Sequence, residues 1–185
     1  MLKNCIIVHG CTSSPDDMTY NKHWMPWIKK QLENHNITTE IPTMPTPRQP
    51  VYENNKKIFE KLDINNNTIL IWFSCWSAFL IRRLGESKKI VKKLILVAPR
   101  KIAEDKNPLK EIFYDFQVDK TIKDRIKNIT FFTSDNEEVE GKESLKIFHE
   151  AIWWKIISLK NHWHYIFGNM LTVEFPELLK EILGK

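Results

Sequence analysis

The stretch Thr68–Leu84, TILIWFSCWSAFLIRRL, is the feature that most constrains the fold of this chain. It begins as an apolar run of β-branched and aromatic residues that ends at Phe73, which predicts a fully buried strand. A lone hydroxyl follows at Ser74, and from Ala78 onward the residues favour a helix. A buried strand that passes directly into a helix is typical of a parallel sheet, because helices cover both faces of such a sheet.

The rest of the chain alternates in the same way. Short apolar runs predict five further strands, at Lys3–Val8, Ile37–Ile41, Lys93–Val97, Ile129–Thr133 and Lys155–Leu159. Helical spacing predicts helices at about Asn21–Asn34, Val51–Leu62, Ser77–Leu84 (with Gly85 as C-cap), Thr121–Lys127, Glu143–Ile152 and Glu174–Leu183. We expect one α/β domain over residues 1–185, with about six parallel strands and helices on both faces. Arg100–Asp119 reads as irregular and is too short for more than a minimal lid.

Composition limits the classes of partner. The net charge of +5 raises nucleic acid as a ligand, but the lysines are scattered. The densest group, Lys88–Lys93, brackets the start of a strand and is explained by a solvated sheet edge, so we expect no nucleic-acid binding. No apolar run reaches the length of a membrane span or a signal peptide. Three cysteines (Cys5, Cys11 and Cys75) cannot all pair, and we expect reduced thiols in a cytoplasmic protein without a membrane partner.

Polar residues follow the predicted strands at their carboxyl ends, where ligands bind in parallel sheets. They are His9, Gly10, Cys11, Ser74, Asp135, His162 and His164. The order Ser…Asp…His is that of a hydrolase triad, in which histidine takes the proton of the serine and the carboxylate orients the imidazole. The N–H groups of Cys75 and of the Gly10-Cys11 loop are candidates for holding an oxyanion.

Each of these residues also has a structural interpretation. Ser74 is in the position of a helix cap, Asp135 in that of a turn residue, and His164 in that of a surface imidazole. Cys75 is the weaker candidate for the nucleophile, because it lies one residue further into the turn. It is the combined order at the strand ends that favours a catalytic site.

Several segments carry a family resemblance across nearly the whole chain. They are IIVHG at 6–10, HWMPWIKKQLE at 23–33, IPTMPTP at 41–47, SCWSAFLIRRLGE at 74–86, KKLILVAP at 92–99, FTSDN at 132–136 and the tail WHY…GNM…EFPELL. The sequence resembles the small α/β-hydrolases similar to retinoblastoma-binding protein 9, a group of serine hydrolases. The resemblance implies a triad with Ser74 and His164, the latter preferred over His162 by its spacing to Met170 and Glu174-Phe175-Pro176. The D-x-x-V register of the acid falls on Asn136, so Asp135 is the predicted acid and Glu137 the alternative.

Tryptophan stands where the resemblance implies glycine. The elbow pattern G-x-S-x-G has Trp72 and Trp76 at its two glycine positions, and the chain holds 7 Trp but only 5 Gly. Trp163 precedes the candidate histidine, and Trp153-Trp154 lie at a helix-to-strand junction where we expect a left-handed glycine. An indole on each side of Ser74 is expected to displace or bury the hydroxyl. The alternatives are an inactive relative, an enzyme with an altered turn, or a gene whose UGA codons encode glycine.

The sequence therefore predicts a serine hydrolase of a small ester or amide, acting through an acyl-enzyme on Ser74. The resemblance implies neither a metal nor an organic cofactor. Phe113, Tyr114 and Phe116 are expected either to border the pocket or to pack in the core. The competing hypothesis is a binding protein on a catalytically impaired hydrolase scaffold, because Trp72, Trp76 and Trp163 replace glycines.

Overall fold

The computed structural model describes residues 4–12, 19, 22–45, 51–103 and 107–184. Six strands form one parallel sheet in the order β2-β1-β3-β4-β5-β6. Their bounds are Asn4–Val8 (β1), Thr38–Glu40 (β2), Ile69–Phe73 (β3), Lys93–Val97 (β4), Ile129–Ser134 (β5) and Lys155–Leu159 (β6). The prediction of a single α/β domain with a six-stranded parallel sheet is confirmed.

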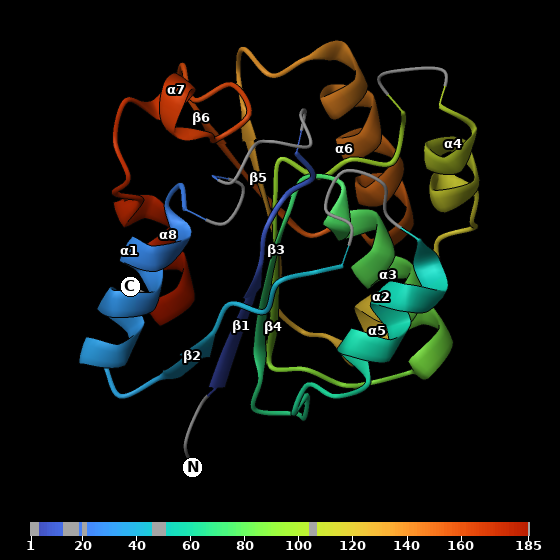
Figure 1. Cartoon of the computed structure of the whole chain (residues 1–185), viewed down its shortest axis with the longest axis horizontal. Coiled ribbons are helices and arrows are strands. Elements are labelled where there is room, and N and C mark those ends of the chain that lie inside the picture. Colours follow the sequence, from blue (N-terminus) through green and yellow to red (C-terminus); the bar gives the residue numbers. More distant parts are fainter. Residues whose placement is uncertain (1–3, 13–18, 20–21, 46–50, 104–106, 185) are drawn as a thin grey trace.

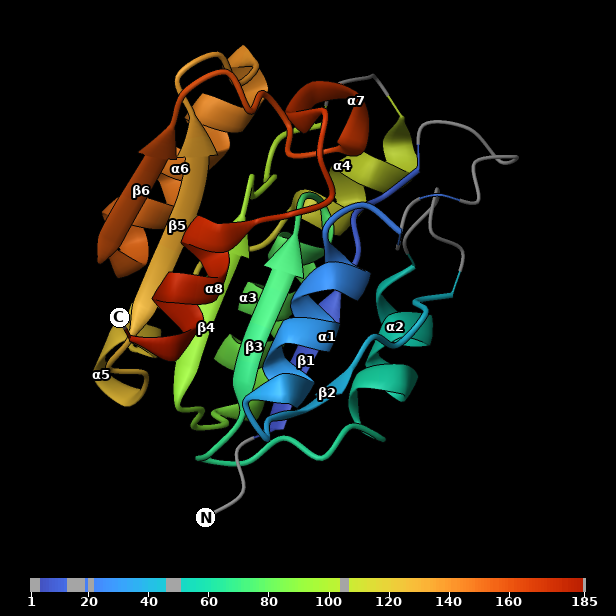
Figure 2. The same cartoon turned by 90° about the vertical axis from the view of Figure 1, so that its left-hand side faces the viewer.

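Helices cover both faces of this sheet (Figures 1 and 2). They are α1 (Met25–Asn34), α2 (Tyr52–Phe59), α3 (Trp76–Ser87), α4 (Pro108–Tyr114), α5 (Ile122–Arg125), α6 (Val139–Ile152), α7 (Phe167–Met170) and α8 (Pro176–Leu183). Helices α1 and α8 lie on one face, and α2, α3, α5 and α6 lie on the other. Side chains of the central strands alternate between two apolar clusters, one under each layer of helices.

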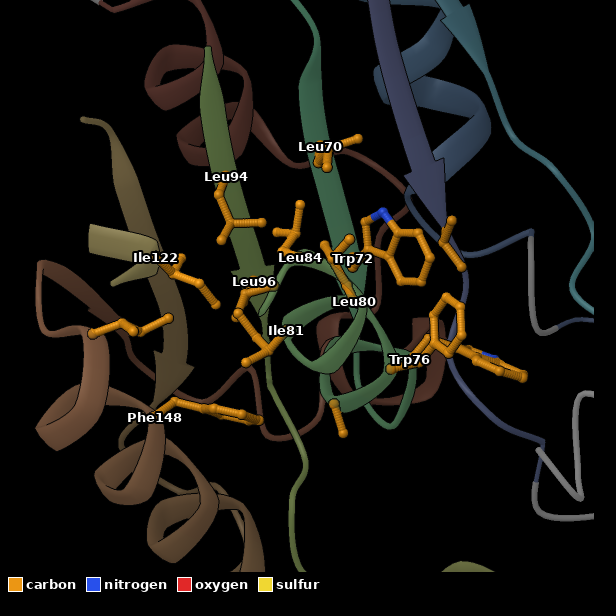
Figure 3. Close-up of a cluster of buried hydrophobic side chains, with 14 of the residues drawn as sticks. Leu70, Trp72, Trp76, Leu80, Ile81, Leu84, Leu94, Leu96, Ile122 and Phe148 are labelled. Atoms are coloured by element: carbon orange, nitrogen blue, oxygen red, sulfur yellow. The ribbon is translucent and has the colours of Figure 1, made fainter. Parts of the chain in front are cut away.

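The larger cluster lies between the sheet and helix α3, as Figure 3 shows. Leu70 and Trp72 of β3 point into it beside Leu94 and Leu96 of β4, and Leu80 and Leu84 of α3 close it from the helix side. All of these side chains are fully buried. Burial on both faces explains why β3 reads in the sequence as an unbroken apolar run rather than an alternating one.

Two helical features of the structure differ from those predicted from the sequence. The segment 100–119 was expected to be irregular, but it contains α4, whose start is marked by Asn107 accepting a hydrogen bond from the Leu109 N–H (3.0 Å) and by Pro108 at the first position. Gly85 is not a C-cap: it lies inside α3, and Lys88 ends the helix with φ 55°. The start signal of α4 was thus present in the sequence, whereas at Gly85 the helix continues for two more residues.

The cysteines also differ from expectation. Cys11 and Cys75 form a disulfide that spans 64 positions of sequence, while Cys5 is free and buried. The expectation of reduced thiols is therefore wrong for two of the three cysteines. Because disulfides are rare in the cytoplasm, they weigh against the cytoplasmic location, which stays a prediction. Among the described residues, no helix combines the length and hydropathy needed to span a membrane.

Candidate active site

Ser74 lies on the turn between β3 and α3, at the carboxyl edge of the sheet. Its φ of 56° is in the left-handed region, which is rare for a residue with a side chain and marks a tight turn. The Ser74 N–H donates to the Val97 carbonyl (2.9 Å), and the Ser74 carbonyl accepts from the Arg100 N–H (3.2 Å). Both bonds tie the turn to β4 and its following loop, so the strained backbone is held in place from one side.

His164 faces Ser74 from the loop after β6. Ser74 Oγ and His164 Nε2 are 2.8 Å apart, a hydrogen-bond distance between residues 90 positions apart in sequence. On the other side of the ring, Nδ1 lies 3.1 Å from Oε1 and 3.3 Å from Oε2 of Glu137. The tautomer that satisfies both contacts donates from Nδ1–H to Glu137 and accepts the Ser74 hydroxyl proton at Nε2.

The structure thus brings Glu137, and not Asp135, to the imidazole. The Asp135 carboxylate accepts a hydrogen bond from the Asn161 N–H (2.8 Å) and lies at the exposed surface. His162, the histidine disfavoured by spacing, donates from Nδ1–H to the Lys160 carbonyl (2.7 Å). Asp135 and Glu137 lie two positions apart in one turn, and only the longer Glu side chain extends back toward the ring.

Arg100 and Gly141 form the surroundings of the Glu137 carboxylate, and sequence analysis missed both. The Arg100 side chain is 2% exposed and that of Glu137 only 1%, with Nη2 3.5 Å from Oε1, and Arg100 also pairs with Glu138. Backbone Glu138 N–H donates to Glu137 Oε1 at 3.0 Å. A Cβ at position 141 would lie 2.7 Å from Glu137 Cγ, so glycine leaves the space that this side chain fills.

The Glu137 carboxylate belongs to a group of three charged side chains beside His164. Arg100 carries one positive charge against the two negative charges of Glu137 and Glu138, which leaves one net negative charge beside the imidazole. Arg100 Nη2 also lies 3.4 Å from His164 Nδ1. When Nδ1 carries its proton, both atoms are donors, so this contact is not a hydrogen bond.

A cavity of about 310 Å³ opens beside Ser74 and His164. Gly10, Cys11 and Cys75, the residues predicted to hold an oxyanion, line it together with Ser74. Gly10 lies so close to the turn that a Cβ there would be 2.9 Å from the Phe73 ring and 3.2 Å from Ser74 Cβ. Cys75 precedes the first turn of α3, where backbone N–H groups lack helical partners. Its sulfur is in the disulfide with Cys11, which excludes it as a nucleophile in this state.

His9, also predicted to lie in this group, is elsewhere. It is fully buried and does not line the cavity. Its Nδ1–H donates to the Gly10 carbonyl (2.7 Å), and Nε2 accepts from the Met44 N–H (3.0 Å). Burial lowers the pKa of His9 from 6.5 to about 4, so the ring is neutral near pH 7 and joins the end of β1 to the loop after β2.

The three aromatic residues expected at the pocket separate. Tyr114 of α4 lines the cavity, whereas Phe113 points into the core against Trp76, with ring centroids 5.9 Å apart. Phe116 lies under the Lys101 ammonium group, 3.9 Å from its ring centroid. Figure 2 shows α4 and α7 at the end of the sheet toward which the strands point, on the same side as the cavity-lining segments.

The tryptophans do not displace the serine. Trp72 and Trp76 are fully buried in the cluster between β3 and α3, and neither lines the cavity, whereas Ser74 does. The expected displacement of Ser74 is therefore wrong for this structure, while the alternative of burial agrees with its 7% exposure. Their indole nitrogens find no hydrogen-bond partner within the described part of the chain, which is unfavourable for a buried donor. Trp163 has φ 39°, but Trp153 has φ −46° and Trp154 is not left-handed either, so the glycine-type backbone expected at their junction is absent.

A serine on a strand-to-helix turn, facing an imidazole backed by a carboxylate at the edge of a parallel sheet, is the arrangement of the α/β hydrolases. Such a site can activate a hydroxyl for attack on an acyl group. Within the described ranges, no three His, Cys, Asp or Glu side chains gather to hold a metal ion.

Comparison with known proteins gives the family. A family model described as serine hydrolase matches residues 5–170, and the chain therefore belongs to the serine hydrolase family. The ydeN gene product of B. subtilis has a similar structure, with a TM-score of 0.85, 20% identity and coverage of 98% of this chain and 97% of that one.

Two structures described as esterases share the fold at greater distance. Est1E from Butyrivibrio proteoclasticus matches with a TM-score of 0.63 and 15% identity, covering 98% of this chain and 89% of its own. Carboxylesterase CesB from Bacillus subtilis matches with a TM-score of 0.58 and 12% identity, covering 100% and 85%. No match was found among curated protein sequences.

Proposed function

We propose that this protein hydrolyses a small ester, or an amide of similar size, through an acyl-enzyme formed on Ser74. The observation that carries the proposal is the continuous contact from Ser74 Oγ to His164 Nε2 and from His164 Nδ1 to Glu137. Membership of the serine hydrolase family supports it, and so do the esterases that share the fold. We also propose that the protein is related to the small hydrolases similar to retinoblastoma-binding protein 9, which its sequence resembles.

The reaction follows from the roles of these atoms. His164 Nε2 takes the Ser74 proton as Oγ attacks the acyl carbon, and the resulting imidazolium returns that proton to the leaving group. Water then attacks the acyl-enzyme with the same histidine as base. The N–H groups of Cys75 and Cys11 are proposed to hold the oxyanion, and Glu137 to orient the ring and stabilise its charged form.

The size of the cavity limits the substrate. A volume of about 310 Å³ is at the small end of the range for ligand pockets. Its lining mixes the apolar side chains of Phe73, Ile102 and Ile166 with polar groups near the serine. We therefore expect short acyl esters to react faster than long ones.

Labelling with a fluorophosphonate probe tests the nucleophile. The wild-type protein should be modified at Ser74, and Ser74→Ala should abolish both labelling and hydrolysis of p-nitrophenyl acetate. Ser77→Ala is the matched control, because the Ser77 hydroxyl is buried and donates to the Trp72 carbonyl (3.3 Å) outside the cavity. A folded wild-type protein that is not labelled and does not hydrolyse short esters would instead favour the binding protein on an inactive scaffold.

Glu137→Gln tests the acid. The amide keeps the shape of the side chain but removes the charge that faces the imidazole, and the corresponding change in a serine protease lowers kcat by about 10⁴. We expect a fall of at least 10² in kcat for p-nitrophenyl acetate, with a smaller change in KM, because the charge matters most in the transition state. An unchanged kcat would remove Glu137 from the mechanism.

A further inference from the structure

Three consecutive side chains at the end of β5 bind three consecutive backbone N–H groups in the loop that carries His164. Asp135 Oδ1 accepts from the Asn161 N–H at 2.8 Å, Ser134 Oγ from the His162 N–H at 2.9 Å, and Asn136 Oδ1 from the Trp163 N–H at 2.8 Å. We call residues Asn161–Tyr165 the histidine loop. The Ser134 hydroxyl also donates to Asn136 Oδ1 at 2.6 Å, which joins two of the acceptors to each other.

The backbone of the histidine loop needs such support. Asn161, Trp163 and Tyr165 have φ values of 60°, 39° and 57°, so every second residue is in the left-handed region. None of them is glycine, and a side chain at positive φ is unfavourable, less so for Asn. A loop with this conformation persists only where surrounding contacts fix it.

The loop is also anchored beyond the histidine. Tyr165 is fully buried, its N–H donates to the His162 carbonyl (2.9 Å), and its hydroxyl donates to the Thr133 carbonyl in β5. His164 therefore lies between two points of attachment to the same strand. Its ring reaches Ser74 from a segment that β5 holds on both sides.

We propose that Ser134, Asp135 and Asn136 form a clamp on the backbone of the histidine loop, and that Asp135 is a positioning residue that acts through this loop. The proposal deepens the proposed function and rests on it, since it assigns the residues that aim His164 at Ser74. It assigns two different roles to the residues of the turn Ser134–Glu137. Glu137 faces the imidazole, while the three residues before it hold the loop.

The contacts of Asp135 fit this task. The carboxyl of Asp135 is exposed, and the hydrogen bond from the Asn161 N–H is the main reason that its pKa lies below the ordinary value. What the clamp uses is an oxygen acceptor at Oδ1, which an asparagine provides equally well. A triad acid, by contrast, depends on its negative charge. The two roles therefore respond differently to loss of charge without loss of shape.

Comparison of Asp135→Asn with Asp135→Ala tests the clamp. Asp135→Asn keeps the acceptor and should keep kcat for p-nitrophenyl acetate within about threefold of wild type. Asp135→Ala removes the acceptor and should lower kcat about tenfold or more, with little change in KM. Asn136→Ala, which frees the Trp163 N–H, should have a similar effect. If Asp135→Asn is as inactive as Glu137→Gln, Asp135 is the acid and the proposal is wrong. An Asp135→Ala variant with wild-type kcat would also overturn the proposal.

A second measurement separates the clamp from the proposed function. The proton on His164 Nδ1, which is hydrogen-bonded to Glu137, should give a low-field NMR resonance. This resonance reports the position of the ring without any turnover. We expect it in wild type and in Asp135→Asn, and we expect it weakened or absent in Asp135→Ala at a temperature where that variant is folded. An unchanged resonance in Asp135→Ala contradicts the clamp. Absence of fluorophosphonate labelling in a wild-type protein that shows the resonance contradicts only the hydrolase.

Discussion

At the scale of single residues, Glu137 reaches His164 through a space that position 141 leaves empty. Gly141 lies within helix α6, where alanine would be more favourable by about 1 kcal/mol. A Cβ there would approach Glu137 Cγ to 2.7 Å and Cδ to 2.9 Å, which is closer than real contacts allow. The glycine is thus unfavourable for the helix and favourable for the carboxylate that faces the imidazole.

Gly141→Ala should therefore lower both activity and stability. We expect kcat to fall at least tenfold, because Glu137 must move away from the imidazole, and the free energy of unfolding to fall despite the better helix former, because Glu137 also moves away from the buried Arg100. The measurements are p-nitrophenyl acetate kinetics and thermal unfolding. Gly168→Ala is the control, since a Cβ at that helical position meets no atom within 4 Å. Equal kcat values for the two variants would count against the Glu137 geometry.

Trp163 is the tryptophan whose backbone fits a glycine. Its φ of 39° is unfavourable for a side chain, and Trp163→Gly should raise the free energy of unfolding by about 1 kcal/mol. Trp153→Gly, at an exposed position with φ −46°, should give no such gain. Thermal unfolding of both variants checks this difference, and a Trp163→Gly protein less stable than wild type would contradict it.

The same observation bears on the hypothesis of recoded glycine codons. Left-handed backbone supports it at Trp163 but not at Trp153 or Trp154. The unbonded indole nitrogens of Trp72 and Trp76 do not bear on it, because the buried indole of Trp24 lacks a hydrogen-bond partner as well. The gene provides the test. UGA codons at these positions would make glycine the natural residue, and UGG codons would exclude the hypothesis at every position where they occur.

At the scale of elements, the disulfide joins the loops that follow β1 and β3. Cys11 and Cys75 both line the cavity, and their backbone N–H groups are the proposed oxyanion donors. A bond between these two loops limits how far the donors move apart. Closing a loop of this length also stabilises a folded chain by about 4 kcal/mol in the chain-entropy model.

Reduction should therefore lower both stability and activity. We expect alkylation of Cys11 and Cys75 only after treatment with dithiothreitol, a lower midpoint of thermal unfolding, and a fall in kcat larger than the change in KM. A Cys11→Ser/Cys75→Ser double variant is the control, since its activity should not respond to the reductant. Alkylation of both cysteines in untreated protein would show that the bond is absent.

The element scale also shows what the sequence predicts well. Strands β1, β3, β4 and β5 were recognisable because burial on both faces gives an unbroken apolar run, whereas the edge strands β2 and β6 are largely exposed. The parallel sheet follows from strands separated by helices. Ser74 and His164 could be singled out because both follow strands at the same edge. Which carboxylate faces the ring could not be deduced, since Asp135 and Glu137 share one turn. The direction of Glu137 depends on Arg100 and Gly141, and that of Asp135 on the Asn161 N–H.

At the scale of the whole molecule, the stability of the fold should depend on pH through His9, a buried titratable group at the end of β1. His9 is fully buried between the Gly10 carbonyl and the Met44 N–H, an arrangement that requires the neutral ring. Burial lowers its pKa to about 4, against 6.5 in the unfolded chain. Protonation in the fold would turn the Nε2 acceptor into a donor facing another donor.

The sign of the pH dependence follows from these values. Between pH 6.5 and 4 the unfolded chain binds a proton at His9 that the folded chain does not, so the folded state loses stability as pH falls through this window. The two pKa values differ by about 2.5, which corresponds to a contribution of about 3 kcal/mol to the free energy of unfolding. This contribution is present in full above pH 6.5. His9→Gln cannot titrate, and the free energy of unfolding from urea titrations should fall more steeply toward pH 4 in wild type than in this variant. Parallel curves for the two proteins would mean that His9 is protonated with equal ease in both states, which the buried acceptor at Nε2 argues against.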